Sequence, residues 1–256
     1  MKKVLEARNI SKVYDTGESK FTALKGISLQ VNEGDFVGIM GPSGSGKTTL
    51  LNVLSTIDNT SKGEILIDGK DVVSMNDDKL ALFRRNHLGF IFQDYNLLDT
   101  LTVRENIALP LALSNVKARE VDSRVIEIAK KFGINDILDK YPYQISGGQK
   151  QRCAASRAIV TNPSIIFGDE PTGALDSKSA TDLLETIEIL NENNKATILM
   201  VTHDAFAASY CKRVVFIKDG ELYQELQRND LTRKQFFKKV VDVMSTISGG
   251  SVNDVI

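Results

Sequence analysis

Alternating apolar and polar residues predict strands in the first third of the chain. Residues 4 to 31 alternate in this way and predict two strands, the second with Ile27, Leu29 and Val31 on one face. Residues 63 to 69 alternate again and end in an Asp-Gly pair, which is typical of a hairpin turn. These segments are expected to bury one face of a sheet and expose the other.

Other strands are expected to be buried on both faces. Short apolar runs predict them over residues 36–40, 88–92, 164–168 and 197–201. A further strand is predicted from Arg213 to Leu222, with a turn at Asp219-Gly220. Helical spacing separates several of these runs, so the pattern predicts an α/β fold.

The segment from Asp94 to Gln144 interrupts this order. Its apolar residues follow helical spacing with charges on the opposite face, and Gly133 is placed to end a helix. The strand pattern resumes near Ile165. We therefore expect an inserted helical subdomain over about residues 94–160.

Composition limits the classes of function. The chain has 256 residues, 42% of them hydrophobic, and a formal net charge of −1, so nucleic-acid binding is not expected to be its main activity. No apolar run reaches the roughly 18 to 20 residues that span a bilayer, and the N-terminus lacks a signal-peptide core. Cys153 and Cys211 lack metal-type spacing and are expected in the core. These features predict a cytoplasmic protein whose membrane role, if any, needs a separate partner.

A phosphate-binding pattern lies between the strand at 36–40 and the next helix. It fits G-x-x-x-x-G-K-T and comprises Gly41, Pro42, Ser43, Gly44, Ser45, Gly46, Lys47, Thr48 and Thr49. Glycines let backbone N–H groups turn toward a polyphosphate, and the helix N-terminus adds positive charge. We expect Lys47 to reach the β- and γ-phosphates and Thr48 to ligate Mg²⁺. The chain is therefore expected to bind a nucleoside triphosphate.

Polar residues directly follow three other buried strands. Gln93 follows the run at 88–92, Asp169 and Glu170 follow 164–168, and His203 follows 197–201. Ligands of α/β sheets bind at the carboxyl ends of the strands. We expect Asp169 to hold Mg²⁺ through water, Glu170 to polarise the attacking water and His203 to contact the γ-phosphate. The alternatives are surface carboxylates and a structural histidine.

A second helix start lies at Ser146-Gly147-Gly148-Gln149. Ser146 and Gln149 have the spacing of a capping box, so a helix with two glycines in its first turn is expected here. Such a helix start is an anion site, and the phosphate loop already supplies one. One active site does not need two anion sites, so the second anion site is expected to bind a phosphate that is held by another copy of the protein.

Together these features resemble the nucleotide-binding subunit of an ABC transporter. The resemblance spans roughly residues 2 to 226 and rests on the phosphate loop, Gln93, the residues from Ser146 to Gln149, the Asp169-Glu170 pair, Ala174-Leu175-Asp176 and His203. It implies a P-loop NTPase cassette over residues 1–226, with a mixed sheet, an antiparallel β subdomain and the inserted α-helical subdomain. ATP and Mg²⁺ are the implied cofactors.

The resemblance also implies roles for single residues. Tyr14, by itself a packed or surface tyrosine, would stack on adenine. Gln93 would sense Mg²⁺ and couple to the membrane partner. Ser146 and Gly148 would contact the γ-phosphate held by the opposing subunit, Glu170 would be the catalytic base and His203 would complete the site. Gly147, Gln149 and Asp176 are placed among the nucleotide-binding residues, and a homodimer with two ATP molecules is implied.

Longer runs narrow the resemblance within the family. Residues 101–111 are similar to the branch for macrolide export, lipoprotein release and peptide resistance, and residues 89–100 and 198–211 to bacitracin-resistance (Bce-type) ATPase subunits. This implies a position at the cytoplasmic face of the membrane, on a single large permease with an extracellular domain that also signals to a sensor kinase. Lipoprotein release, macrolide efflux and control of cell-wall hydrolases remain alternatives. A soluble ATPase of DNA repair would carry a long coiled coil or a zinc motif, and one of translation would carry two cassettes. The sequence shows neither feature, so these two classes are not favoured.

The segment 227–256 is expected to be a helical tail. Thr232 would cap a helix with one apolar stripe, flanked by lysines. The stripe comprises Phe236, Phe237, Val240, Val241 and Met244. It would dock on the protein's own surface or on the dimer mate, or alternatively contact the permease or lipid headgroups.

Overall fold

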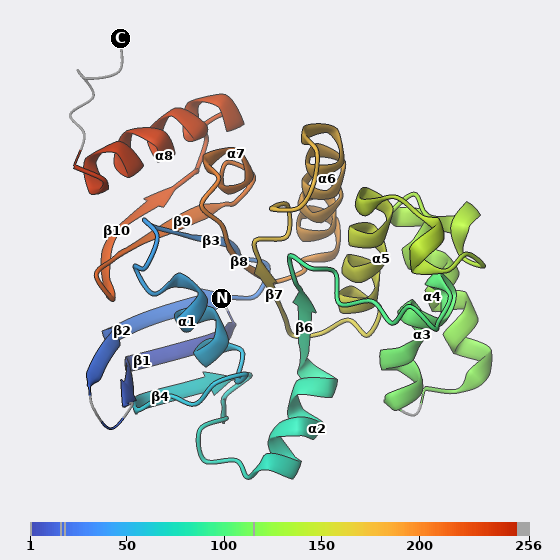
Figure 1. The fold of residues 1–256 in the computed structure, drawn as a ribbon, viewed down its shortest axis with the longest axis horizontal. Coiled ribbons are helices and arrows are strands. Elements are labelled where there is room, and N and C mark those ends of the chain that lie inside the picture. The colour runs from blue at the N-terminus through green and yellow to red at the C-terminus, as the bar shows by residue number, and fades with distance from the viewer. Residues whose placement is uncertain (1, 16, 18, 115, 250–256) are drawn as a thin grey trace.

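The structure is a computed structural model that describes residues 2–15, 17, 19–114 and 116–249. The molecule contains two sheets, helices that flank the larger sheet, a group of inserted helices on one side and a C-terminal helix (Figure 1). Residues 250–256 of the predicted tail lie outside the described residues.

The smaller sheet is antiparallel and has the order β2-β1-β4-β5. Its strands are β1 (Lys3–Asp15), β2 (Lys20–Asn32), β4 (Lys62–Ile67) and β5 (Lys70–Asp71). Ile27, Leu29 and Val31 face the core while Ser28 and Gln30 are exposed. The expected alternation and the antiparallel β subdomain are therefore confirmed.

The larger sheet is mixed and has the order β10-β9-β3-β8-β7-β6. Its strands are β3 (Phe36–Met40), β6 (Leu88–Ile91), β7 (Ile165–Asp169), β8 (Ile198–Val201), β9 (Arg213–Lys218) and β10 (Glu221–Gln227). All neighbouring pairs are parallel except β9 with β10. Because the carboxyl ends of parallel strands meet at one edge, the phosphate loop, Asp169 and His203 share that edge.

Helices flank this sheet. They are α1 (Lys47–Leu54), α2 (Asp77–His87), α6 (Ser177–Asn194) and α7 (Ala205–Ala208). The inserted helices gather to one side of the sheet in Figure 1. They are α3 (Val103–Leu113), α4 (Ala118–Lys131), the 3₁₀ turns η1 (Asn135–Ile137) and η2 (Pro142–Gln144), and α5 (Gly147–Ile159). This order confirms the inserted helical subdomain.

The last helix, α8 (Arg233–Ile247), begins at a Thr232 capping box as expected. Phe236 and Val240 are fully buried against the protein's own core, whereas Phe237 and Val241 are each 37% exposed. Within the predicted stripe, Phe236 and Val240 therefore dock on the protein's own surface, whereas Phe237 and Val241 do not. The docked face instead continues to Ile247.

Both cysteines lie in the core, as predicted, and are free thiols. Burial raises the pKa of the Cys153 thiol to about 12 and raises that of Cys211 as well. Neither thiol is therefore a reactive thiolate near neutral pH.

Candidate nucleotide-binding site

The phosphate loop joins β3 to α1 and depends on Gly46. This residue has φ 100°, and a Cβ atom here would lie 2.8 Å from the carbonyl oxygen of Ala23. An L side chain would be both strained and crowded at this position. Gly46 is also the N-cap of α1, so no side chain caps this helix start and its amides stay open to a ligand.

Lys47 is held inside the loop that it follows. Its Nζ donates to the carbonyl oxygens of Gly41 and Pro42, each at 2.9 Å, and the residue is 9% exposed. Burial lowers the pKa of the Lys47 ammonium, opposed by the carboxylates of Glu170 and then Asp169. A phosphate group would add the negative charge that favours the charged lysine, so the loop fits an anionic ligand.

Asp169, the last residue of β7, and Glu170, which follows it, lie close enough to interact with this lysine. Burial raises the pKa of the Asp169 carboxyl, the neighbouring Glu170 raises it further, and Lys47 opposes both effects. The positive charge of Lys47 therefore does not fully offset the burial of Asp169 and the negative charge of Glu170. Thr48 and Gln93 present exposed oxygen donors, and such donors with a carboxylate suit Mg²⁺. The residues present fit the expected ion.

Glu170 and His203 meet across the edge of the sheet. His203 Nδ1 lies 2.9 Å from Glu170 Oε2, although the two residues follow different strands, β8 and β7. Glu170 has φ 44°, a left-handed conformation that costs a non-glycine residue about 1 kcal/mol or more. Its backbone N–H donates to the Val201 carbonyl at 3.0 Å, which helps to hold this conformation. The two residues expected to be catalytic therefore form one unit.

Ser146 opens α5 as expected. Its Oγ accepts from the Gln149 N–H at 3.3 Å, and Gln149 Oε1 accepts from the Ser146 N–H at 2.9 Å. Ser146 and Gly147 are exposed, whereas Gly148 is buried with no room for a Cβ beside Ser179. In Figure 1, α1 and α5 stand on opposite sides of β7 and β6. The two predicted anion sites therefore lie apart within one chain.

Residues 24–173 match the model of the ABC transporter family. The chain belongs to the ABC transporter family. The sequence-based family assignment and fold class are therefore confirmed.

Three relatives place the cassette within this family. The bacitracin export ATP-binding protein BceA of Halalkalibacterium halodurans is 56% identical over 98% of this chain and 99% of its own length. The macrolide export ATP-binding/permease protein MacB of Syntrophobacter fumaroxidans is 42% identical over 87% of this chain but 31% of its own length. The dimeric cassette MJ0796 of Methanocaldococcus jannaschii, solved with ADP and Pi, has a TM-score of 0.80 and 40% identity, covering 87% of this chain and 98% of that one.

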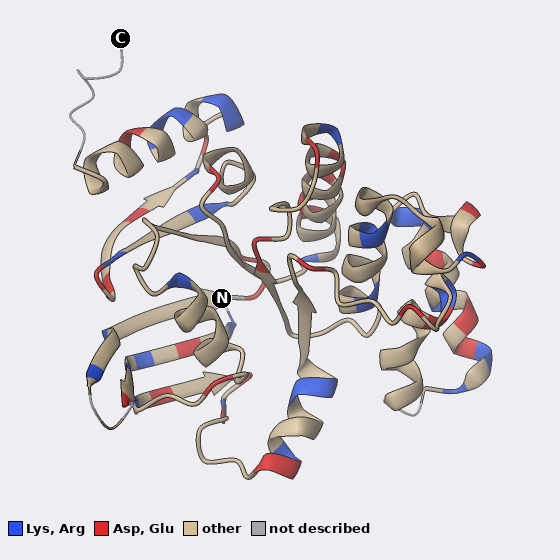
Figure 2. Cartoon of the chain, in the orientation of Figure 1, with Lys and Arg blue, Asp and Glu red and all other residues tan. Residues whose placement is uncertain are grey.

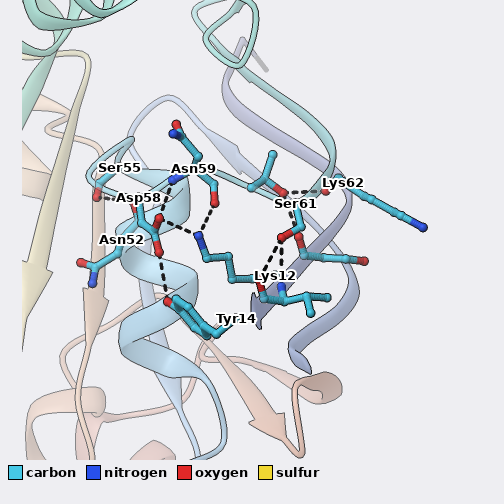
Figure 3. A network of polar contacts seen from close by, with 11 residues as sticks. Lys12, Tyr14, Asn52, Ser55, Asp58, Asn59, Ser61 and Lys62 are labelled. Carbon is cyan, nitrogen blue, oxygen red and sulfur yellow. Dashed lines mark hydrogen bonds and ion pairs between the residues drawn. The ribbon is translucent and has the colours of Figure 1, made fainter. Parts of the chain in front are cut away.

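Tyr14 of the cassette is held by a network that the sequence did not reveal (Figure 3). Its hydroxyl donates to Asp58 Oδ2 at 3.0 Å. Lys12 Nζ donates to Asp58 Oδ1 at 2.6 Å and to the Asn59 carbonyl at 2.7 Å, and lies 4.9 Å from the centroid of the Tyr14 ring. The ring is 40% exposed, so it is oriented but still open to a ligand.

Gln151, whose role was not predicted from the sequence, links the loop that contains Gln93 to the loop that contains Glu170. Its Nε2 donates to the Phe92 carbonyl at 3.0 Å and to the Pro171 carbonyl at 2.6 Å. The helix α5 therefore ties the carboxyl ends of β6 and β7 together. Gln93 itself is exposed and lies beside Gly173, where a Cβ would come 3.0 Å from its Cδ.

Asp176 caps α6 in the structure. Its Oδ1 accepts from the backbone N–H groups of Lys178 and Ser179 at 3.1 and 3.0 Å, and its Oδ2 accepts from the Ser179 hydroxyl at 2.7 Å. These contacts lower the pKa of the Asp176 carboxyl. The hydrogen bond donated by the Ser179 backbone N–H has the largest effect. The nucleotide role expected for Asp176 stays a prediction.

Proposed function

We propose that this cassette is the ATP-hydrolysing subunit of a transporter that protects cells against bacitracin-like antimicrobial peptides. It works as a homodimer and drives a separate membrane permease. The observation that carries the proposal is the 2.9 Å pair of Glu170 and His203 at the sheet edge that bears the phosphate loop. The BceA similarity over nearly the whole chain supports the substrate class.

Each residue at the edge has a defined task in this reaction. Lys47 and the open amides of α1 would hold the phosphates, and Thr48, Gln93 and Asp169 would hold Mg²⁺. Bound Mg²⁺ would offset the negative charge of the phosphate oxygens. Glu170 accepts a proton from the attacking water, and His203 keeps the Glu170 carboxylate aimed at the site.

A second copy of the chain completes the site. Ser146 and Gly147 are exposed at the start of α5, but α5 lies across the sheet from the phosphate loop of its own chain. A homodimer would bring the start of α5 in one protomer to the phosphate loop of the other. The dimeric state of MJ0796 supports this arrangement.

The permease would dock in a groove between the inserted helices and the larger sheet. The groove has a volume of about 440 Å³ and is lined by apolar side chains, including Phe90, Phe92 and Leu113. Arg84 and Arg85, in the last turn of α2, also line it. Figure 2 shows this basic end of α2 next to the uncharged strand β6. Because Gln93 directly follows Phe92, docking here would reach the Mg²⁺ site. An apolar segment with acidic ends would fit.

The finer features of the partner are part of the same proposal. The permease would be one large protein with an extracellular domain that passes a signal to a sensor kinase, with this subunit on its cytoplasmic face. Within the described residues, no helix is long and apolar enough to cross a membrane.

The MacB similarity favours a second candidate within the same branch, macrolide efflux. Lipoprotein release and control of cell-wall hydrolases would use the same catalytic residues. A pull-down with the full chain would separate these candidates because their permeases differ in size.

The function is tested by the bacitracin concentration that stops growth of cells carrying Glu170→Gln. We expect this concentration to fall clearly below that of the unmodified strain, because the base is lost while ATP still binds. Glu185→Gln, at an exposed position on α6, is the control. An unchanged concentration for Glu170→Gln would contradict the bacitracin assignment.

A further inference from the structure

The C-terminal helix α8 packs against the short helix that follows His203. Phe236 and Val240 are fully buried in the same core cluster as Ala207 and Ala208 of α7. Figure 1 shows α7 and α8 side by side, in agreement with their contacts. The buried face of α8 therefore forms part of the support of α7.

A second contact fixes the start of α8. The Arg233 guanidinium lies over the ring of Tyr210, with its Cζ 4.3 Å from the ring centroid. Tyr210 is 1% exposed and packs edge-on against Phe206 of α7, with the ring centroids 5.4 Å apart. The contact therefore continues from α8 through Tyr210 into α7.

The helix α7 is in turn joined closely to His203. Asp204 caps α7, since its Oδ1 accepts from the Phe206 N–H at 2.8 Å. The Asp204 N–H donates to Thr202 Oγ1 at 3.0 Å. His203 stands between these two residues, so a shift of α7 would move the His203 side chain relative to Glu170.

The comparisons indicate that α8 is an addition to the basic cassette. The match to BceA covers 98% of this chain and so includes α8. The match to MJ0796 takes in 98% of that chain but 87% of this one, and the unmatched share is about the length of the segment after β10. MJ0796 therefore has the fold of an ABC cassette although it has no matched segment of this length.

We propose that α8 is a brace that positions His203 for hydrolysis, with Phe236 and Arg233 as positioning residues. This inference rests on the proposed function, which places His203 in the reaction. In this proposal the brace acts mainly on α7, which leads directly to His203, and not on the loop between β3 and α1. It therefore affects the rate of hydrolysis more than the affinity for ATP.

Adjacent phenylalanines provide a matched pair for the kinetic test. Phe236 is fully buried and Phe237 is 37% exposed, on the same helix. In the purified full chain, we expect Phe236→Ala to lower kcat for ATP by about tenfold with KM within about twofold, since small displacements of catalytic groups are costly. Phe237→Ala is expected to change neither. Equal effects of the two variants, or a rise in KM as large as the fall in kcat, would overturn the proposal.

Arg233 provides a variant that does not disturb the core. Arg233→Ala is expected to lower kcat by about twofold to threefold, and Arg233→Lys to restore it because a cation again covers the Tyr210 ring. This variant decides the question if Phe236→Ala does not fold. An unchanged kcat in Arg233→Ala would then overturn the proposal.

A spectroscopic measurement separates the brace from the proposed function. The chain contains two histidines, so ¹³C-histidine labelling gives two ring signals, which His87→Gln assigns. We expect Phe236→Ala and Arg233→Ala, but not Phe237→Ala, to shift or broaden the His203 signal. An unmoved His203 signal overturns the brace. The His203 signal could move in Phe236→Ala and Arg233→Ala while His203→Ala still hydrolyses ATP at the full rate. That result would support the contact between α8 and His203 but refute the role of His203 in the reaction.

Discussion

The N-termini of α1 and α5 are both expected to bind phosphate, but they are built in opposite ways. At α1, the N-cap is Gly46 and no side chain caps the helix. At α5, Ser146 and Gln149 form a complete capping box before any ligand arrives. A side-chain cap contributes about 1 kcal/mol, so α1 forgoes this stability and leaves its amides for phosphate. The helix start expected to bind ATP therefore lacks a side-chain cap, whereas the helix start expected to meet a second copy has its cap in place.

Gly46→Ala should have the largest effect because it closes the open helix start. The new Cβ would meet the Ala23 carbonyl oxygen at 2.8 Å in a left-handed conformation. We expect the free energy of unfolding to fall by about 2 to 3 kcal/mol and ATP binding to be lost. Thermal unfolding and a fluorescent ATP analogue measure both.

Gly44→Ala is the matched control for this variant. Gly44 also has a positive φ, 76°, but a Cβ there would meet no atom within 4 Å. Only the backbone strain of about 1 kcal/mol should remain. Equal losses of stability in the two variants would show that the close contact at Gly46 is unimportant.

Ser146→Ala should have a smaller effect that separates capping from dimer formation. Loss of the capping box should lower the free energy of unfolding by about 1 kcal/mol. Thr102→Ala removes a similar capping box from α3 and should cost about the same. Only Ser146→Ala should weaken ATP-dependent dimerisation, measured by light scattering. The same loss of dimer in Thr102→Ala would contradict a phosphate role for Ser146.

Changes at Tyr14 should affect the fewest properties, because they act on the base end of the nucleotide. Tyr14→Ala removes a stacking ring worth about 1 to 3 kcal/mol and should raise KM for ATP by about fivefold or more, with kcat unchanged. Tyr14→Phe removes only the 3.0 Å hydrogen bond to Asp58 and should raise KM by about twofold. Steady-state hydrolysis measures both. An unchanged KM in Tyr14→Ala would show that adenine does not stack there.

Local patterns predicted much of this molecule. The phosphate loop, the strand ends at Asp169 and His203, and the Ser146 capping box each depend on neighbours within a few residues. Sequence spacing records such neighbours directly. The inserted helices were predicted for the same reason.

Long-range contacts could not be read in this way. Asp58 meets Lys12 and Tyr14 across more than 40 residues, and Gln151 reaches Phe92 across 59. Nothing near Asp58 or Gln151 in the chain signals these partners. The helix α8 shows the same limit, since its five apolar positions predict a stripe but not which part of it docks. That choice depends on the shape of α7 and Tyr210.

The most direct test of the account is the mass of Glu170→Gln with and without ATP, measured by size-exclusion chromatography with light scattering. The chain has a mass of 28.2 kDa. We expect a monomer without nucleotide and a dimer with Mg²⁺ and ATP, because the proposed site combines the phosphate loop of one copy with Ser146 of the other. Adding Ser146→Arg should leave ATP bound but keep the protein monomeric. A Glu170→Gln monomer at saturating ATP, together with full hydrolysis by Ser146→Arg alone, would contradict a site shared between two copies.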